Sequence, residues 1–289
     1  MPTLPGISGC WRRLTAAMNT ESGPIGLSSA PSSAPKIVLV AIAVLSVVLA
    51  VVLSVIAALV PGVPWWLGIP LGIAAAVVAV VLRVRRSAEL LLAGLGAAPA
   101  DPDRYARFHN IAEGLSLAGG VDEPELYVVD DDARNAAAVA QGNRSAIVAS
   151  TGLLEALDRI SLEGLVAEAL VRIRNGDAEA STLGAALFSG LLRGPLAPIG
   201  KPAAIVGLRR LLPEDRDLAA DRAAVALTRY PPGLLHAFTT IRSGTARVGQ
   251  PSAATEHIWL VPPSTVGEGG ELVVNGVPLE VRIDVLTEL

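Results

Sequence analysis

The sequence contains very little cysteine, histidine or lysine. Among its 289 residues Cys10 is the single cysteine, and there are 3 histidines. One cysteine excludes an intramolecular disulfide and any cysteine-based zinc knuckle. Lys36 and Lys201 are the only lysines among 23 basic residues, which, together with abundant alanine, indicates a GC-rich bacterial genome.

Two further classes of function find no support in the residues. The sequence has no G-x-S-x-G string, and Cys10 belongs to a segment predicted to be disordered, with no histidine near it, so no nucleophilic hydrolase site is expected. The formal net charge is −4, and no basic stripe with interleaved aromatic residues occurs. Nucleic acid is therefore not an expected partner.

Apolar residues, in contrast, are in excess and locally concentrated. They make up 52% of the chain, against 17% charged residues, which is more than one soluble domain usually carries. Residues 37–60 hold no charge and are interrupted only by Ser46 and Ser54. After a "PGVP" break, residues 65–82 are again uncharged and begin with two tryptophans. Both runs are long enough to cross ~30 Å of hydrocarbon, and tryptophan favours the membrane interface. We expect two transmembrane helices, at about 37–60 and 64–83.

The flanks of these runs predict their orientation. Residues 1–36 precede the first run, and its apolar core exceeds the ~7–15 residues of a signal peptide, so we reject that interpretation. The connecting loop has no basic residue, whereas arginine or lysine lies outside both runs, at Arg12, Arg13, Lys36, Arg83, Arg85 and Arg86. The positive-inside rule then puts both ends in the cytoplasm. We expect a multi-pass protein of the bacterial plasma membrane with most of its chain cytoplasmic.

Composition divides the chain into three parts. Residues 1–35 are rich in Ser, Pro and Gly and are expected to be disordered, with Met18 as an alternative start. Residues 36–86 form the membrane hairpin, and residues 87–289 form the cytoplasmic domain. In this domain, residues 182–210 are broken by prolines, so they do not form a straight span, although docking on the membrane surface stays open.

Periodicity predicts an α+β domain that is mainly helical. Apolar residues at helical spacing indicate helices, and short β-branched runs indicate a small sheet. Ser161 is expected to cap the helix that begins at residue 162. The expected strands are 125–131, 145–150 and 271–274. The expected helices are 104–118, 151–157, 162–175, 217–230 and one from Pro278, and residues 87–98 are expected to extend the second span.

Seven short strings, in order, resemble the HtpX-type family of membrane zinc metallopeptidases. The resemblance covers the chain from about Tyr105 to Leu289. The strings are "HNIAEGL" (109–115), "PELYVVDDDARNAAA" (124–138), "TGLLEAL" (151–157), "LEGLVAEALVRIRNGD" (162–177), "DLAADRAA" (217–224), "TEHIWLVPP" (255–263) and "VPLEVRIDVL" (277–286). The resemblance implies a gluzincin-type domain and a role in protein quality control.

The residues that would hold zinc are replaced. The family's H-E-x-x-H helix places two histidines one turn apart on the metal, with a glutamate to activate water. The resemblance puts Glu168, Ala169 and Arg172 at those three positions and Asp217 at the third-ligand position. Gly276 stands where the family tends to carry another histidine. Arginine has no lone pair for a metal, and alanine is no base.

Two other features complete the list of candidate sites. The resemblance makes the segment with Asn135, Ala136 and Ala138 an edge strand to which peptide can add, although an ordinary strand end is an equally good interpretation. The three histidines, His109, His236 and His257, lack a ligand-type partner at suitable spacing. We expect them to pack or cap rather than bind metal.

Three hypotheses follow for the function. The favoured one is an inactive family member, a pseudoprotease that binds or scaffolds a membrane or cytoplasmic protein and needs no cofactor. The second is an active metalloendopeptidase with a non-standard site, which would require zinc. The third is a purely structural membrane protein. Under the first, Arg172 is predicted to bridge Glu168 and Asp217 as a structural ion-pair cluster in place of the metal charge.

Overall fold

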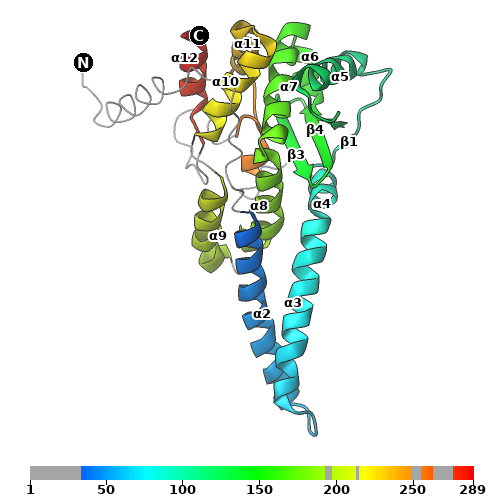
Figure 1. Ribbon diagram of the computed structural model, residues 1–289, viewed down its shortest axis with the longest axis vertical. Coiled ribbons are helices and arrows are strands. Elements are labelled where there is room, and N and C mark those ends of the chain that lie inside the picture. Colours follow the sequence, from blue (N-terminus) through cyan, green and yellow to red (C-terminus); the bar gives the residue numbers. More distant parts are fainter. Residues whose placement is uncertain (1–33, 193–196, 213–214, 249–254, 263–275) are drawn as a thin grey trace, which may run out of the picture. The chain divides into compact units, whose positions relative to one another are not determined.

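The computed structural model describes residues 34–192, 197–212, 215–248, 255–262 and 276–289 (Figure 1). The expected fold class is confirmed, because the described chain is mainly helical with one small mixed sheet. The predicted tail before residue 34 and the predicted strand at 271–274 lie outside the described residues.

Two apolar helices open the described chain. Helix α2 spans Ala34–Ala58, and the short turn η1 (Trp65–Leu67) leads into α3 (Gly68–Arg85). Over Val38–Ala58 and Trp65–Arg85 these helices are long and apolar enough to cross a membrane, in agreement with the predicted runs. They pack closely, since a Cβ on Gly68 would lie 2.2 Å from Ser54 N and one on Gly72 2.4 Å from Ala50 N.

The second apolar helix does not continue as expected into residues 87–98. Arg86 leaves the helical region (φ −109°, ψ 12°), and a separate helix α4 (Ser87–Gly94) follows. The next elements are a short strand β1 (Ala98–Pro99) and helix α5 (Ala106–Gly119), which ends at Gly120 in the left-handed region (φ 62°). Glycine suits this position because it has no Cβ.

The sheet contains β1, β2 (Glu125–Val129), β3 (Ala136–Gln141) and β4 (Arg144–Ser150) in the order β1-β2-β4-β3. Strands β2 and β4 are parallel, whereas β3 and β4 form an antiparallel hairpin. Its turn contains Gly142 at φ 58°. The sheet therefore ends at β3, whose outer side is not paired with a strand of the sheet.

Helix α6 (Thr151–Ala156) and helix α7 (Arg159–Arg174) follow β4. The prediction that Ser161 caps α7 is wrong. Asp158 is the N-cap, because its side chain accepts a hydrogen bond from Ser161 N at 2.8 Å. A carboxylate at this position also interacts favourably with the helix dipole.

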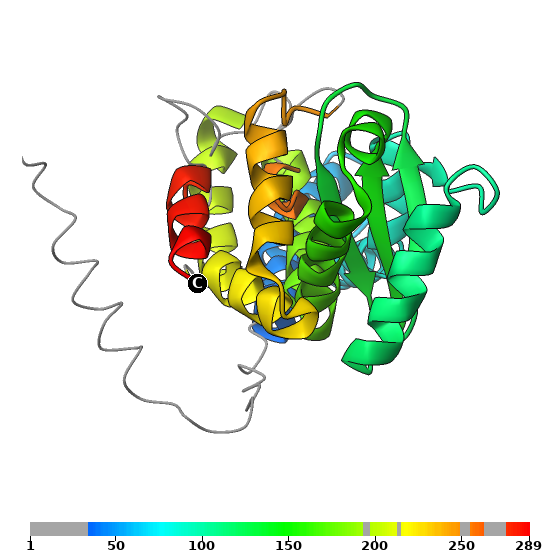
Figure 2. The same ribbon diagram turned by 90° about the horizontal axis from the view of Figure 1, so that it is seen from above.

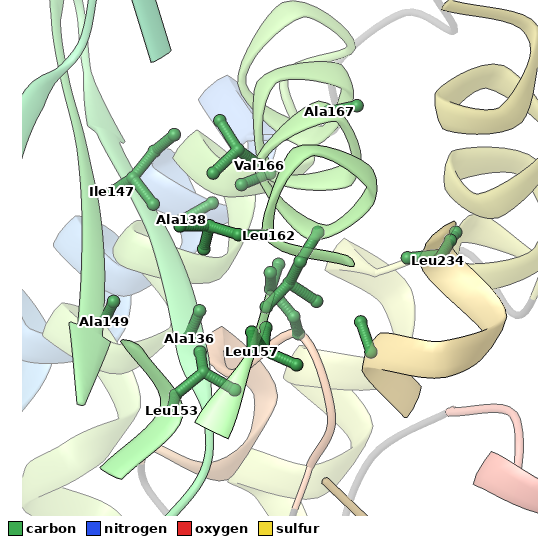
Figure 3. Close-up of a cluster of buried hydrophobic side chains, with 14 of the residues drawn as sticks. Ala136, Ala138, Ile147, Ala149, Leu153, Leu157, Leu162, Val166, Ala167 and Leu234 are labelled. Carbon is green, nitrogen blue, oxygen red and sulfur yellow. The ribbon is translucent and has the colours of Figure 1, made fainter. Parts of the chain in front are cut away.

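The remaining helices are α8 (Asp177–Leu192), α9 (Ala197–Leu211), α10 (Arg216–Thr228), α11 (Pro231–Arg242) and α12 (Leu279–Thr287), with the turn η2 (Glu256–Ile258) before α12. Helix α7 lies between the sheet and the pair α10 and α11 (Figure 2). The main core forms where α7 meets the sheet, and its side chains include Ile147, Leu162, Val166 and Leu234 (Figure 3). This central helix carries the candidate site.

Candidate functional site

Six charged side chains lie together in the interior, where helices α7, α10 and α12 meet. Each is no more than 4% exposed. Charged side chains are seldom fully buried unless they are paired, and this group holds three acids and three arginines. We call it the buried charge cluster. Its members are Glu168, Arg172, Arg216, Asp217, Asp221 and Arg282.

Helical spacing explains how four of the six come together. Glu168 and Arg172 are one turn apart on α7, and Asp217 and Asp221 are one turn apart on α10. Residues at this spacing share a face of a helix. Because α7 and α10 pack against each other, the two faces meet in the interior.

The structure brings together the three residues of the ion-pair cluster expected from the sequence. Arg172 Nη2 lies 2.7 Å from Glu168 Oε1 and 3.0 Å from Asp217 Oδ1. Arg172 Nε donates a second hydrogen bond to Glu168 Oε1 at 3.0 Å. The guanidinium therefore bridges a carboxylate on its own helix and one on α10.

Arg282, on α12, is a second bridging cation that sequence reasoning missed. Its Nε and Nη2 bind the two oxygens of Asp221 at 2.8 and 2.6 Å, and Nη2 also donates to Glu168 Oε1 at 2.6 Å. The guanidinium carbon stands 4.3 Å from the centre of the Phe238 ring, which adds a cation–π contact. Glu168 Oε1 is thus shared by two arginines.

The third arginine extends the cluster toward α8. Arg216 Nε is 3.6 Å from Asp217 Oδ1, and Nη1 donates to Ser181 Oγ at 2.9 Å. The other oxygen of Asp217 accepts a hydrogen bond from Val277 N at 3.1 Å. Gly276, the remaining motif position, directly precedes Val277, whose main-chain N–H makes this contact with Asp217.

Burial and charge pull the pKa values of the cluster in opposite directions. Burial lowers the pKa of Arg172, but Glu168 and Asp217 raise it and prevail. Burial raises the pKa of Asp217, but Arg172 and the other arginines bring it below the usual value. Burial raises the pKa of Asp221 to about 6, against the attraction of Arg282. The arginines therefore oppose the effect of burial at both aspartates.

Asp177, at the start of α8, lies close enough to interact electrostatically with the buried charge cluster. Burial raises the pKa of its carboxyl, and the positive charges of Arg172 and Arg216 oppose this rise. Helix N-termini favour negative charge. Asp177 is thus a partly buried acid at the edge of the cluster rather than a member of its ion pairs.

A stretch of main chain also binds the arginines. Leu260 O accepts hydrogen bonds from Arg172 Nη2 at 3.1 Å and from Arg282 Nη1 at 2.6 Å. His257 O accepts one from Arg216 Nη2 at 3.1 Å. Each of the three buried arginines therefore holds a carbonyl group of residues 257–260.

The expected peptide-binding edge is buried. Asn135, Ala136 and Ala138 are at most 3% exposed. An isolated antiparallel bridge joins Ala137 to Trp259, and Leu260 N donates to Ala136 O at 2.8 Å. The chain's own residues thus lie along β3.

The histidines lie apart and bind oxygen atoms. His109 Nε2 is 3.0 Å from Ala100 O, His236 Nδ1 is 2.8 Å from Ser161 Oγ, and His257 Nε2 is 2.9 Å from Ser181 O. Burial lowers the pKa of His257 to about 4, with Arg216 acting in the same direction. These contacts are those of packing and capping side chains.

The donor set of the buried charge cluster does not fit a zinc ion. Zinc takes His, Cys or carboxylate ligands, whereas the cluster presents three guanidinium groups, which are always protonated. Glu168 Oε1 and Asp217 Oδ1, the carboxylate oxygens nearest Arg172, already face its positive charge. Within the described ranges no three His, Cys, Asp or Glu side chains are grouped so as to hold a metal.

Comparison with known proteins defines the family. A protease HtpX homolog from Dictyoglomus thermophilum is 30% identical over 227 residues, which are 69% of this chain and 74% of the relative. The chain belongs to the HtpX family. A second HtpX homolog, from Caldanaerobacter subterraneus, is 28% identical over 242 residues, 72% of this chain and 80% of the relative. No family model and no solved structure matches the chain.

Membership of the HtpX family agrees with the observed fold. The relatives cover most of the chain, and the structure supplies two helices suited to a membrane. The chain is therefore a membrane protein of a metallopeptidase family.

Proposed function

We propose that this HtpX family member is a catalytically inactive pseudoprotease, anchored in the membrane, that acts by binding, scaffolding or regulating another protein. The observation that carries the proposal is the position of Arg172, whose Nη2 lies 2.7 Å from Glu168 Oε1 and 3.0 Å from Asp217 Oδ1. A buried cation here supplies the positive charge that a metal would supply. It cannot bind or activate water as zinc does.

The charge balance supports this proposal. If Glu168, Ala169 and Arg172 occupy the positions of the H-E-x-x-H motif, two ligands and the general base are replaced at once. Carboxylates left in a dry interior without a cation would be costly. Arg172 and Arg282 compensate them, each with several short hydrogen bonds. The site then stabilises the fold and needs no cofactor.

Two alternatives make different predictions. An active membrane metalloendopeptidase of the HtpX type with a non-standard site would need zinc and would cleave unfolded protein. A purely structural membrane protein would neither cleave nor hold a defined partner. Crosslinking in native membranes separates the structural protein from the pseudoprotease, because only the latter is expected to give a discrete crosslinked partner.

For the topology, we propose two spans, at about 37–60 and 64–83 within residues 36–86, with residues 87–289 in the cytoplasm of a bacterial cell. The basic residues beside the spans support this orientation. Arg83, at the end of α3, donates hydrogen bonds to Ala186 O and Ser189 Oγ of α8. A contact of this kind would fix the cytoplasmic domain directly on the bilayer surface. A reporter that is active only in the cytoplasm should therefore be active when it is fused after Leu289.

The decisive assay for inactivity is proteolysis by the full chain in detergent or membranes. We expect no cleavage of an unfolded casein substrate, with or without added zinc. An authentic active HtpX protein under the same conditions provides the positive control. Cleavage by this chain that a chelator abolishes and zinc restores would refute the pseudoprotease and favour the metalloendopeptidase.

A further inference from the structure

The outer side of β3 is occupied by a segment of the same chain. Because the order of the sheet is β1-β2-β4-β3, β3 is an edge strand, and its outer side could accept another strand. Such edges pair readily with extended peptides. Here the occupant is residues 257–261, which we call the closing segment. It is nearly inaccessible to solvent, with exposures of 0–3%.

The closing segment begins in the turn η2 and contacts β3 through an isolated antiparallel bridge. Trp259 bridges Ala137, and Leu260 N donates to Ala136 O. Ile258 and Trp259 pack in the apolar cluster on one face of the sheet, and Leu260 and Val261 pack in the core on the other.

Asn135 continues this pairing beyond the end of β3. Its Nδ2 donates to Val261 O at 2.6 Å, and its Oδ1 accepts from Val261 N at 3.4 Å. The side-chain amide therefore contacts both main-chain polar groups of Val261, as a neighbouring strand would. The same Nδ2 also donates to Ala246 O at 2.9 Å.

The opposite side of the closing segment is held by the buried charge cluster. Arg172 and Arg282 donate to Leu260 O, and Arg216 donates to His257 O. Hydrogen bonds from charged donors are stronger than those between neutral groups. The segment thus lies between the edge of the sheet and three guanidinium groups, and both sides bind its main chain.

We propose that the closing segment is a built-in ligand of the β3 edge, so that this edge and the two guanidinium groups at Leu260 O bind no peptide from another molecule. This inference rests on the proposed function and deepens it. If the pseudoprotease binds a partner, it must use a surface other than the β3 edge, which includes Asn135, Ala136 and Ala138.

Amide hydrogen exchange on the unsubstituted full chain tests the closure directly. We expect the amides of Leu260 and Val261 to exchange as slowly as those in the centre of β4, and the exposed turn at Asn143 to exchange rapidly. Asn135→Ala should accelerate exchange at residues 260–261 by tenfold or more. The matched control, Asn143→Ala, should leave it unchanged. Exchange of Leu260 in the parent at the rate of the turn would overturn the proposal.

A second experiment asks whether a peptide can enter. The unsubstituted chain is mixed with a benzophenone-labelled peptide of sequence EHIWLVP, which copies residues 256–262, and adducts are mapped after irradiation. We expect none on residues 135–141, and adducts elsewhere are consistent with closure. Labelling of β3 would show that the edge is open. Neither readout depends on zinc or turnover, so closure can fail or hold independently of the inactivity tested by proteolysis.

Discussion

Glu168 and Arg282, which are 114 residues apart in the sequence, are joined by a hydrogen bond of 2.6 Å in the interior of the protein. The bond connects α7, the central helix, to α12, the last one. Arg282 also holds Asp221 of α10. A single guanidinium group therefore connects three helices. Their packing depends on charged side chains that are buried and not solvated by water.

Replacing Arg172 should destabilise the domain strongly. Arg172→Ala removes the cation that joins Glu168 to Asp217, so that Glu168 keeps only Arg282 and Asp217 keeps only the more distant Arg216. Loss of one partner from a buried pair costs about 3–5 kcal/mol. Chemical denaturation of the full chain in detergent measures the effect. Arg174→Ala, an exposed arginine on the same helix, is the matched control and should cost less than about 0.5 kcal/mol. Equal stability of the two variants would contradict the cluster.

Arg282 and Asp221 should be coupled energetically. Arg282→Met alone strands Asp221, with an expected cost of about 3–5 kcal/mol. Adding Asp221→Asn removes the stranded charge, so the double variant should be more stable than Arg282→Met. A double-mutant cycle gives the coupling energy. Strict additivity of the two changes would mean that the pair is not buried as the structure shows.

Asn135 is expected to be a stability determinant of the closing segment. Asn135→Ala leaves the main-chain oxygens of Ala246 and Val261 without their donor, and each stranded buried group costs roughly 1–3 kcal/mol. Thermal denaturation compares it with Asn143→Ala, at an exposed turn position, which should be nearly neutral. A neutral Asn135→Ala would indicate that water replaces the amide and that the segment is less enclosed.

His257 should make the protein sensitive to acid. Its pKa is lowered to about 4 in the folded state, so between pH 4 and the unfolded value near ~6.5 the unfolded state binds more protons. Stability from this group is therefore lost as pH falls through that window. Asp221, with its pKa raised to about 6, acts in the opposite direction, because protonation of the folded state favours folding as pH falls.

The two effects can be separated by substitution. His257→Gln preserves a donor toward Ser181 O but cannot titrate, while Asp221 is unchanged. Between pH 7 and pH 5 the variant should lose less stability than the parent, by on the order of 1–2 kcal/mol. Denaturation midpoints at both pH values provide the measurement. Identical pH dependence in parent and variant would show that His257 is not buried as a neutral ring.

Restoring the family motif should recover only weak zinc binding. Glu168→His, Ala169→Glu and Arg172→His together rebuild H-E-x-x-H, but Arg282 keeps its positive charge beside position 168 and opposes a metal cation. We expect weak zinc binding by this triple variant and tighter binding when Arg282→Leu is added. Calorimetric titration with zinc compares the two. Stoichiometric, tight binding by the triple variant would show that Arg282 is not an obstacle.

The sequence predicted the parts of this protein that depend on local patterns. The two apolar runs are long and uncharged, and the spacing of Glu168 and Arg172 on one helix was sufficient to place them together. Ser161 was mistaken for the cap of α7 because Asp158, three residues earlier, is an equally suitable cap and the apolar period does not distinguish them.

Arg282 was missed because its burial depends on partners far away in the sequence. An arginine in a short terminal helix is usually exposed, and nothing within that helix supplies a carboxylate pair. One signal was present: Leu279, Ile283 and Leu286 form an apolar face at helical spacing, and Arg282 falls on that face. The closing segment was missed for a similar reason, since the contact of Trp259 and Leu260 with β3 spans more than a hundred residues of chain.

Metal content is the most direct test of the central claim, that arginine replaces zinc in this member of the family. The full chain is purified without chelator from zinc-supplemented cells, and zinc per chain is measured by elemental mass spectrometry beside an active HtpX protein. We expect stoichiometric zinc in the active protein and a background amount in this chain. One zinc per chain, lost from an Asp217→Ala variant that remains folded, would contradict it.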